Sequence, residues 1–201
     1  AHDLQTPLAV CMNKLELLSE HPDCTEDQLK EIAGLHQALN GIIRLNKSLL
    51  LLSRIDNKQF PETRDICLNH LIHKILEGIN DIYERKALHL RVSEKESLVC
   101  TMNESLATTL ITNLIKNAYV HNYEKGDIGI TISRRMLTIA NTGIDKTLDK
   151  ELLFARFASQ SKQQESTGLG LAIVKSIVDL YSIRIDYQYA NGMHTFTLLF
   201  Y

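Results

Sequence analysis

The amino-acid sequence predicts an α+β fold, in which an antiparallel helical hairpin, half of a dimeric four-helix bundle, precedes an α/β sandwich domain. Two observations predict this fold. Apolar residues recur at helical spacing over the first quarter of the chain, whereas helical and β-like patterns alternate over the rest. A polar stretch around Pro61 separates the two parts, so we expect domains at 1–57 and 66–201 joined by a linker at 58–65.

The composition is that of a globular protein and argues against several other classes. The chain has 201 residues, of which 44% are hydrophobic and 23% are charged. A net charge of −2 without a basic run argues against a nucleic-acid partner. The longest purely apolar stretch, 49–52, is too short to span a bilayer, so we expect membrane attachment only through a segment upstream. The four scattered cysteines predict reduced thiols in a reducing cytoplasm rather than disulfides or a zinc site.

The hairpin is predicted from two apolar stripes. The first helix carries its stripe at Leu4, Leu8, Cys11, Leu15 and Leu18, and the second at Leu35, Leu39, Ile42, Leu45, Leu49 and Leu52. Residues 21–25 interrupt the pattern, and Thr25 with Gln28 resembles a capping box for the second helix. Because two helices cannot cover the stripe alone, we expect a homodimer through the hairpin.

The second domain is predicted as a layer of helices on a mixed sheet. We expect helices at 68–85, 104–122 and 168–181, and strands at 88–93, 97–102, 127–133, 135–140, 183–190 and 193–200. Asn191-Gly192 is a strong hairpin-turn signal between the last two strands. Residues 158–167 are small and polar, a composition typical of a mobile lid.

The first residues offer a nucleophile. His2 and Thr6 lie one helical turn apart, and Asp3 can hold one ring nitrogen of His2 so that the other is free to attack. Pro7 cannot donate to the Asp3 carbonyl, so we expect a bend there. A lone histidine on a helix is ordinarily a solvated residue, and only the neighbouring residues favour function. Because His2 stands at the start, we expect the chain to be a fragment of a longer protein.

Two later motifs predict a site for phosphates and a metal ion. Asn113 and Asn117 lie one turn apart on a packed helix, and their carboxamide oxygens suit Mg²⁺, although both could equally be surface residues. Gly168 and Gly170 stand where the late helix begins, and there the backbone can approach phosphate oxygens closely. Together with His2, these motifs indicate phosphoryl transfer from ATP to a histidine.

At this point the sequence resembles the sensor histidine kinases of two-component signalling. HDLQTPL at 2–8 resembles the H-box of that family, and NLIKNAYVH at 113–121 resembles its N-box. Residues 140–143 resemble the first glycine box, residues 153–157 the F-box, and STGLGLAIVKSI at 166–177 the second glycine box. The motifs follow in the order of the family, and the resemblance covers nearly the whole chain.

The resemblance implies a Bergerat-type ATP-binding sandwich that uses ATP and Mg²⁺. His2 would accept the γ-phosphoryl group, Asp3 would be its acid–base partner, and Thr6 would position water to dephosphorylate a response regulator. Asn113 and Asn117 would bind the metal. The nucleotide would contact Asn113, Asn117, His121, Asn141, Gly143, Arg156, Lys162, Thr167, Gly168, Leu169, Gly170 and Leu171.

The resemblance also implies partners and a location. A response-regulator receiver domain would dock on residues 8–16 and part of the second helix, and the chain would be the cytoplasmic portion of a membrane-anchored bacterial sensor protein. Alternatives are a docking or phosphatase module with a degenerate nucleotide site, and an ATPase like the chaperone or topoisomerase members of the same fold.

Several residues depart from the family pattern. Asn141 stands where the family has an aspartate that accepts the adenine amino group, and the lost charge is worth about 1–2 kcal/mol or about tenfold in affinity. Asp145 replaces the second glycine of that box, and Val120 replaces a lysine that contacts phosphate. Ala158 and Ser159 lack the usual aromatic–basic pair, for which Lys162 and Arg156 are the candidate substitutes.

Overall fold

The computed structural model describes residues 2–157 and 168–201, apart from the side chains of residues 2–3 and 80–82. The hairpin consists of α1 (His2–Ser19) and α2 (Glu26–Asp56), which pack against each other. The predicted capping box is confirmed: the Thr25 hydroxyl accepts the Gln28 N–H at 3.3 Å, and the Gln28 side chain accepts the Thr25 N–H at 2.9 Å. These two bonds satisfy amide groups that would otherwise be unpaired at the start of α2.

The sandwich is built on a five-stranded sheet in the order β2-β4-β5-β7-β6. Its strands are β2 (His89–Glu94), β4 (Asp127–Ser133), β5 (Met136–Thr142), β6 (Arg184–Ala190) and β7 (Met193–Leu199). Strand β2 runs parallel to β4, and the other neighbours are antiparallel. A second, two-stranded sheet pairs β1 (Arg64–Cys67) with β3 (Val99–Met102).

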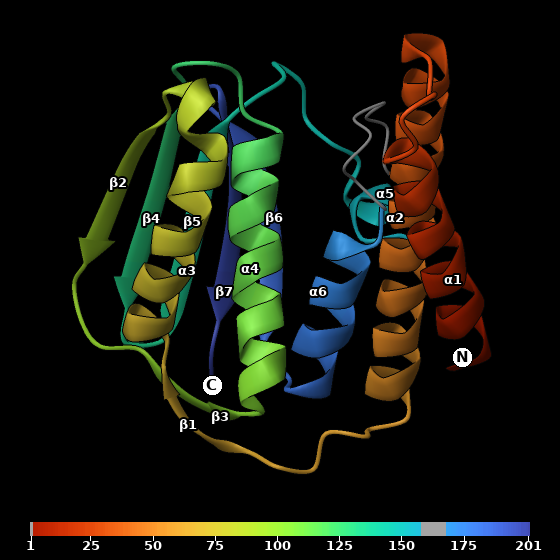
Figure 1. Cartoon of the computed structure of the whole chain (residues 1–201). Coiled ribbons are helices and arrows are strands. Elements are labelled where there is room, and N and C mark those ends of the chain that lie inside the picture. Colours follow the sequence, from red (N-terminus) through yellow and green to blue (C-terminus); the bar gives the residue numbers. More distant parts are fainter. Residues whose placement is uncertain (1, 158–167) are drawn as a thin grey trace.

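Helices α3 (Leu68–Tyr83), α4 (Glu104–Val120) and α6 (Gly170–Leu180) lie in one layer against the large sheet (Figure 1). Alternate residues of the central strands point into the core; Ile128, Ile130 and Ile132 of β4 are buried, for example. The helices contribute fully buried residues such as Leu110 and Val174 to the same core. The predicted α+β class, with a hairpin followed by a sandwich, is therefore confirmed.

The predicted elements are found with small shifts at their ends. The expected helices 68–85, 104–122 and 168–181 correspond to α3, α4 and α6, and the expected strands correspond to β2 to β7. The end of the expected helix 68–85 falls in the 3₁₀ helix η1 (Glu84–Lys86), which is followed by Ala87 with a φ of 48°. The predicted lid, 158–167, lies outside the described residues.

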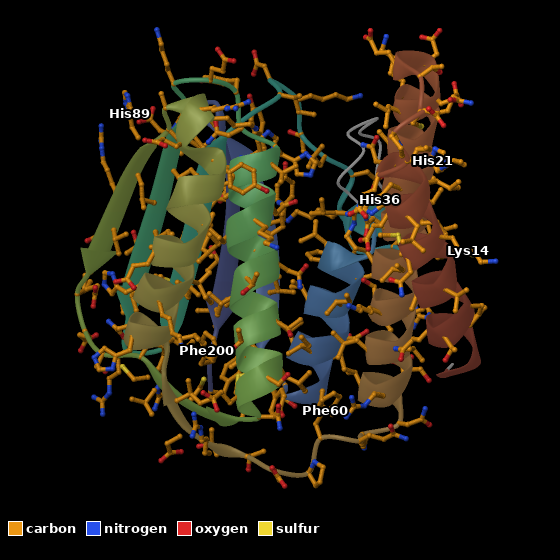
Figure 2. The ribbon with its side chains drawn as sticks, in the orientation of Figure 1. Lys14, His21, His36, Phe60, His89 and Phe200 are labelled. Carbon is orange, nitrogen blue, oxygen red and sulfur yellow. The ribbon has the colours of Figure 1, made fainter. Side chains whose placement is uncertain are left out.

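Two short elements were missed, β1 and α5 (Lys150–Leu153). Each has four residues, too few to show a period in the sequence. Strand β1 begins at Arg64, inside the predicted linker. It was missed also because its pairing partner β3 is distant in the sequence. Phe60, labelled in Figure 2, lies in that segment and packs against the core, with the Arg54 guanidinium 4.7 Å from its ring centroid.

The hairpin and the sandwich meet along α2 and α6. In Figure 1, α6 lies between α4 and α2, and α1 lies beyond α2. Leu52 and Ile55 of α2 are 1% and 3% exposed and belong to the core. The Arg156 guanidinium donates to the Asp56 carboxylate at 3.1 Å, which joins the segment after α5 to the end of α2. None of the helices described is long and apolar enough to cross a membrane.

Candidate nucleotide and phosphoacceptor site

Helix α4 brings the predicted metal ligands to the edge of the core. The Asn103 side chain caps the helix by accepting from the backbone N–H groups of Ser105 and Leu106, at 3.0 and 3.2 Å. One face of α4 is buried, and Asn113 and Asn117 are half-buried beside it. The Asn113 Nδ2 donates to the Thr109 carbonyl at 2.8 Å, which fixes the orientation of the amide. Its Oδ1 is therefore the atom presented towards the neighbouring helix.

That neighbour is the start of α6, where the second glycine box lies. A Cβ on Gly170 would stand 2.9 Å from the Asn113 Oδ1, so the N-box and the second glycine box are in direct proximity. Gly168 has a φ of 67°, in the left-handed region that favours glycine. Leu169 precedes the helix without a side-chain cap, Leu171 is half-buried, and the N–H groups of the first turn have no acceptor within the helix. This arrangement suits an anion.

Asn141, the penultimate residue of β5, is a buried polar residue, 2% exposed. Its Nδ2 donates to the Thr142 carbonyl at 2.8 Å, and this bond sets which amide atom faces the site. Among the residues described, its Oδ1 is the buried side-chain atom that has no hydrogen-bond partner. An unsatisfied buried acceptor costs about 1–3 kcal/mol, so the atom fits a donor from a ligand, such as the amino group of adenine.

A network that the sequence analysis missed supports Asn141. The Thr142 hydroxyl donates to the Asn122 Oδ1 at 2.6 Å and accepts the Asp127 N–H at 2.9 Å, and the Asn122 Nδ2 donates to the Asp127 carbonyl at 3.0 Å. Gly126 lies against this network, and a Cβ there would overlap the Asn122 and Thr142 oxygens. The polar Asn122 directly after the N-box was the available sequence signal, and the structure shows that it is buried.

The C-terminus of α4 approaches the first glycine box. A Cβ on Gly143 would stand 2.9 Å from the His121 carbonyl oxygen and 3.0 Å from the ring of His194. Desolvation, the Lys86 ammonium and His194 hold the pKa of His121 below its usual value, so its imidazole favours the neutral form. The Lys86 Nζ donates to the carbonyls of Tyr119, Val120 and Asn122 at 2.9, 2.9 and 3.0 Å. The positive charge of Lys86 therefore offsets the partial negative charge of the carbonyl groups at the C-terminus of α4.

The other predicted residues that the structure describes, Thr6 and Arg156, lie on other segments of the chain. Helix α1 begins at His2 and continues through Pro7, and Thr6 is exposed. The side chains of His2 and Asp3 lie outside the described residues, as do Lys162 and Thr167 and the departures Ala158 and Ser159. Arg156, expected at the nucleotide, pairs with Asp56 of α2 instead. The structure thus brings together two groups of predicted residues along α4: Asn113 with Gly170, and His121 with Gly143.

Two family models match the chain. The model described as "His Kinase A (phospho-acceptor) domain" matches residues 1–58. The model described as "Histidine kinase-, DNA gyrase B-, and HSP90-like ATPase" matches residues 102–200. The first covers the hairpin, and the second covers most of the sandwich, including the cluster just described.

Relatives and solved structures agree with these matches. The chain is 32% identical over 210 residues to the heme sensor protein HssS of Staphylococcus saprophyticus, covering 100% of this chain and 45% of that protein. It is 28% identical over 206 residues to the sensor histidine kinase HprS of Escherichia coli K12, covering 98% and 45%. The chain thus spans less than half the length of both relatives.

Two solved structures share the fold. The histidine kinase AdeS of Acinetobacter baumannii superposes with a TM-score of 0.68 at 21% identity, covering 98% of this chain and 96% of that one. Full-length ShkA in complex with AMPPNP gives a TM-score of 0.74 at 16% identity, covering 100% and 45%. The matched family models, the ordered motifs and the shared fold lead to one conclusion: the chain belongs to the sensor histidine kinases of two-component signalling.

Proposed function

We propose that the chain uses ATP to phosphorylate His2 and then passes the phosphoryl group to an aspartate of a response-regulator receiver domain. The observation that supports ATP binding is the buried Oδ1 of Asn141, an acceptor without a hydrogen-bond donor from the described part of the protein. The histidine part rests on the H-box at the start of α1 and on the matched phospho-acceptor family model. The ligand AMPPNP in the ShkA complex supports a nucleotide at this fold.

In this proposal the nucleotide lies between α4, the end of β5 and the start of α6. The Asn141 Oδ1 accepts a hydrogen bond from the adenine amino group, and Gly143 lets the adjoining backbone pack closely against His121 and His194. The first-turn N–H groups of α6 bind the phosphates. His121, Leu169 and Leu171 stay proposed nucleotide contacts on the strength of the family resemblance. Lys162 and Thr167 stay proposed phosphate contacts on the strength of the family resemblance.

Asn113 and Asn117 fit a magnesium ion. Both present carboxamide groups at the edge of α4, and the bond from Asn113 Nδ2 to Thr109 leaves the Oδ1 as the free acceptor. They would hold Mg²⁺, which when bound neutralises charge on the phosphates. Carboxamide and phosphate oxygens are hard ligands of the kind that Mg²⁺ takes in proteins.

For the transfer, a ring nitrogen of His2 forms a bond to the γ-phosphorus, and ADP leaves. Asp3 holds the proton on the other ring nitrogen and stabilises the imidazolium that forms. Thr6, exposed on α1, would later position water for dephosphorylation of the regulator. If Arg156 contacts phosphate in this step, its ion pair with Asp56 must open first, because the guanidinium is engaged on α2.

We further propose that the hairpin forms a homodimer and receives the regulator. Its exposed apolar residues favour a second hairpin as partner: Leu4, Val10, Leu17, Leu18, Leu29, Leu35, Ile42 and Leu49 are each 38% exposed or more. The regulator would dock at residues 8–16 of α1 and on α2; Figure 2 shows Lys14 on the side of α1 that faces away from the sandwich.

The proposed domain limits are 1–57 for the hairpin, 58–65 for the linker and 66–201 for the catalytic domain. Since the relatives are more than twice as long, we propose that an upstream part anchors the cytoplasmic kinase core to a membrane. These assignments concern the whole protein, of which this chain carries the kinase part.

The test is incubation with γ-³²P-ATP and Mg²⁺, using this chain and a longer version that restores the upstream helix. We expect an acid-labile, alkali-stable label that is lost in His2→Gln, while that variant still binds ATP as the unchanged protein does. A label that persists in His2→Gln would refute the assignment of His2. Absence of label from both versions, with regulator dephosphorylation retained, would favour a phosphatase module instead.

A further inference from the structure

A buried histidine lies directly opposite Asn141 in the sheet. His194 of β7 is 5% exposed and pairs with Asn141 across the β5–β7 ladder, while Tyr189 of β6 pairs with His194 from the other side. Side chains at directly opposed positions of antiparallel strands lie on the same face of the sheet. His194 therefore adjoins the amide that we assign to the base, and it also bounds the space beside Gly143.

Both ring nitrogens of His194 are engaged, and their partners define their roles. The Nε2 lies 2.9 Å from the Ile144 carbonyl oxygen, which can only accept, so the Nε2 carries the proton. The Nδ1 lies 2.8 Å from the Tyr187 hydroxyl, so in the neutral ring it accepts the hydroxyl proton. The Tyr187 oxygen in turn accepts the Leu148 N–H at 3.2 Å. This chain of bonds fastens Ile144 and Leu148, at both ends of one loop, to the β6–β7 hairpin.

We call the hydrogen-bonded chain from Leu148 through Tyr187 and His194 to Ile144 the relay. Aromatic side chains pack around it. Tyr187 is 1% exposed, and its ring stacks on that of His194 with centroids 6.0 Å apart and an interplanar angle of 20°. Burial raises the pKa of Tyr187, which keeps the hydroxyl protonated and able to donate. The centroid of the Tyr189 ring lies 4.8 Å from that of His194, and the Tyr189 hydroxyl donates to Asp145.

We propose that His194 and Tyr187 are positioning residues for the nucleotide base, which hold the loop 144–148 in place beside Asn141 and Gly143. The proposal rests on the proposed ATP site and names residues that fix its shape. It also gives a reason for Asp145, which stands at a glycine position of the family pattern: its carboxylate binds Tyr189, so side chains anchor the loop there. The relay acts by removing alternative loop positions before the base binds.

The test compares two tyrosines that make the same kind of bond. Tyr187→Phe removes the hydroxyl between Leu148 and His194 and keeps the ring. Tyr181→Phe is the matched control, because the Tyr181 hydroxyl accepts the Asn103 N–H at 3.0 Å without touching the loop. We expect Tyr187→Phe to weaken ATP binding about five- to tenfold by isothermal titration calorimetry, and Tyr181→Phe to change it less than about twofold. Equal Kd values for ATP in the two variants would overturn the proposal.

A second measurement tests the relay without nucleotide. Long-range ¹⁵N–¹H spectra of the imidazole should show the Nε2–H tautomer of His194 in the unchanged protein, and the Leu148 amide should be protected from hydrogen exchange. Tyr187→Phe should remove that protection, whereas Tyr181→Phe should not. A ring protonated on Nδ1, or an unprotected Leu148 amide, would refute the relay even if ATP binds. A protein that shows both signatures but binds no ATP would refute the proposed nucleotide function and, with it, the role assigned to the relay.

Discussion

Gly143→Ala is the sharpest probe of the proposed base site, because the neighbours of the added methyl group cannot retreat. The new Cβ would meet the His121 carbonyl oxygen at 2.9 Å and the His194 ring at 3.0 Å. The carbonyls around His121 are held by Lys86, and both His194 nitrogens are hydrogen-bonded. The backbone of Gly143 is not left-handed, so the effect comes from space alone.

Overpacking of this kind costs about 2 kcal/mol, within the usual range for an extra methyl group in a packed region. For a chain of this size that loss lowers the melting temperature by about 4–8 °C. We expect ATP affinity to fall at least about tenfold as well, because the loop beside Asn141 must shift. Thermal denaturation with and without ATP measures both effects.

Gly129→Ala is the matched control. Gly129 lies on β4, and a Cβ there would meet no atom within 4 Å. We expect this variant to melt within about 2 °C of the unchanged protein and to bind ATP normally. If Gly143→Ala melts and binds as Gly129→Ala does, the close approach of Gly143, His121 and His194 is not the structure in solution, and the reasoning fails.

Two further predictions concern titration. Burial raises the pKa of the Cys100 thiol to about 11, whereas hydrogen bonds from the backbone of His70 and from Ser97 lower the pKa of the Cys67 thiol. At pH 8, iodoacetamide should therefore alkylate Cys67 on the order of a hundred times faster than Cys100. Comparable alkylation rates for the two cysteines, measured by peptide mass mapping, would contradict this prediction. Hydrogen bonds from Asn69, the larger effect, and from His73 hold the pKa of the Glu94 carboxyl group below the ordinary 4.5. The contribution of Glu94 to folding stability is therefore present above the unfolded pKa and is lost as the pH falls through the folded pKa. Glu94→Gln should therefore flatten the decline of urea-unfolding stability below about pH 4.5, and parallel pH profiles for the two proteins would count against the shift.

Several features of the site depended on contacts that no local pattern contains. Arg156 belongs to the F-box, and the family resemblance predicted that it contacts the nucleotide. In the fold its partner is Asp56, a hundred residues earlier. His194 lies in the predicted strand 193–200, but the strand pattern does not show which residue lies beside it. Its position opposite Asn141 is set by the register of β5 and β7, strands separated by more than fifty residues.

The sequence by itself determined the class of fold, the hairpin with its capping box, most helices and strands, and the motifs that identify the family. These features follow from the spacing of apolar residues and from short motifs, which act within one or two turns or strands. Only the tertiary structure decided that the Asn141 Oδ1 is buried without a partner, that Gly170 approaches Asn113, and that a tyrosine–histidine relay anchors the loop 144–148. The physical reason is that strand register and helix packing join residues distant along the chain, and the chemistry of a site depends on which atoms such packing leaves unsatisfied.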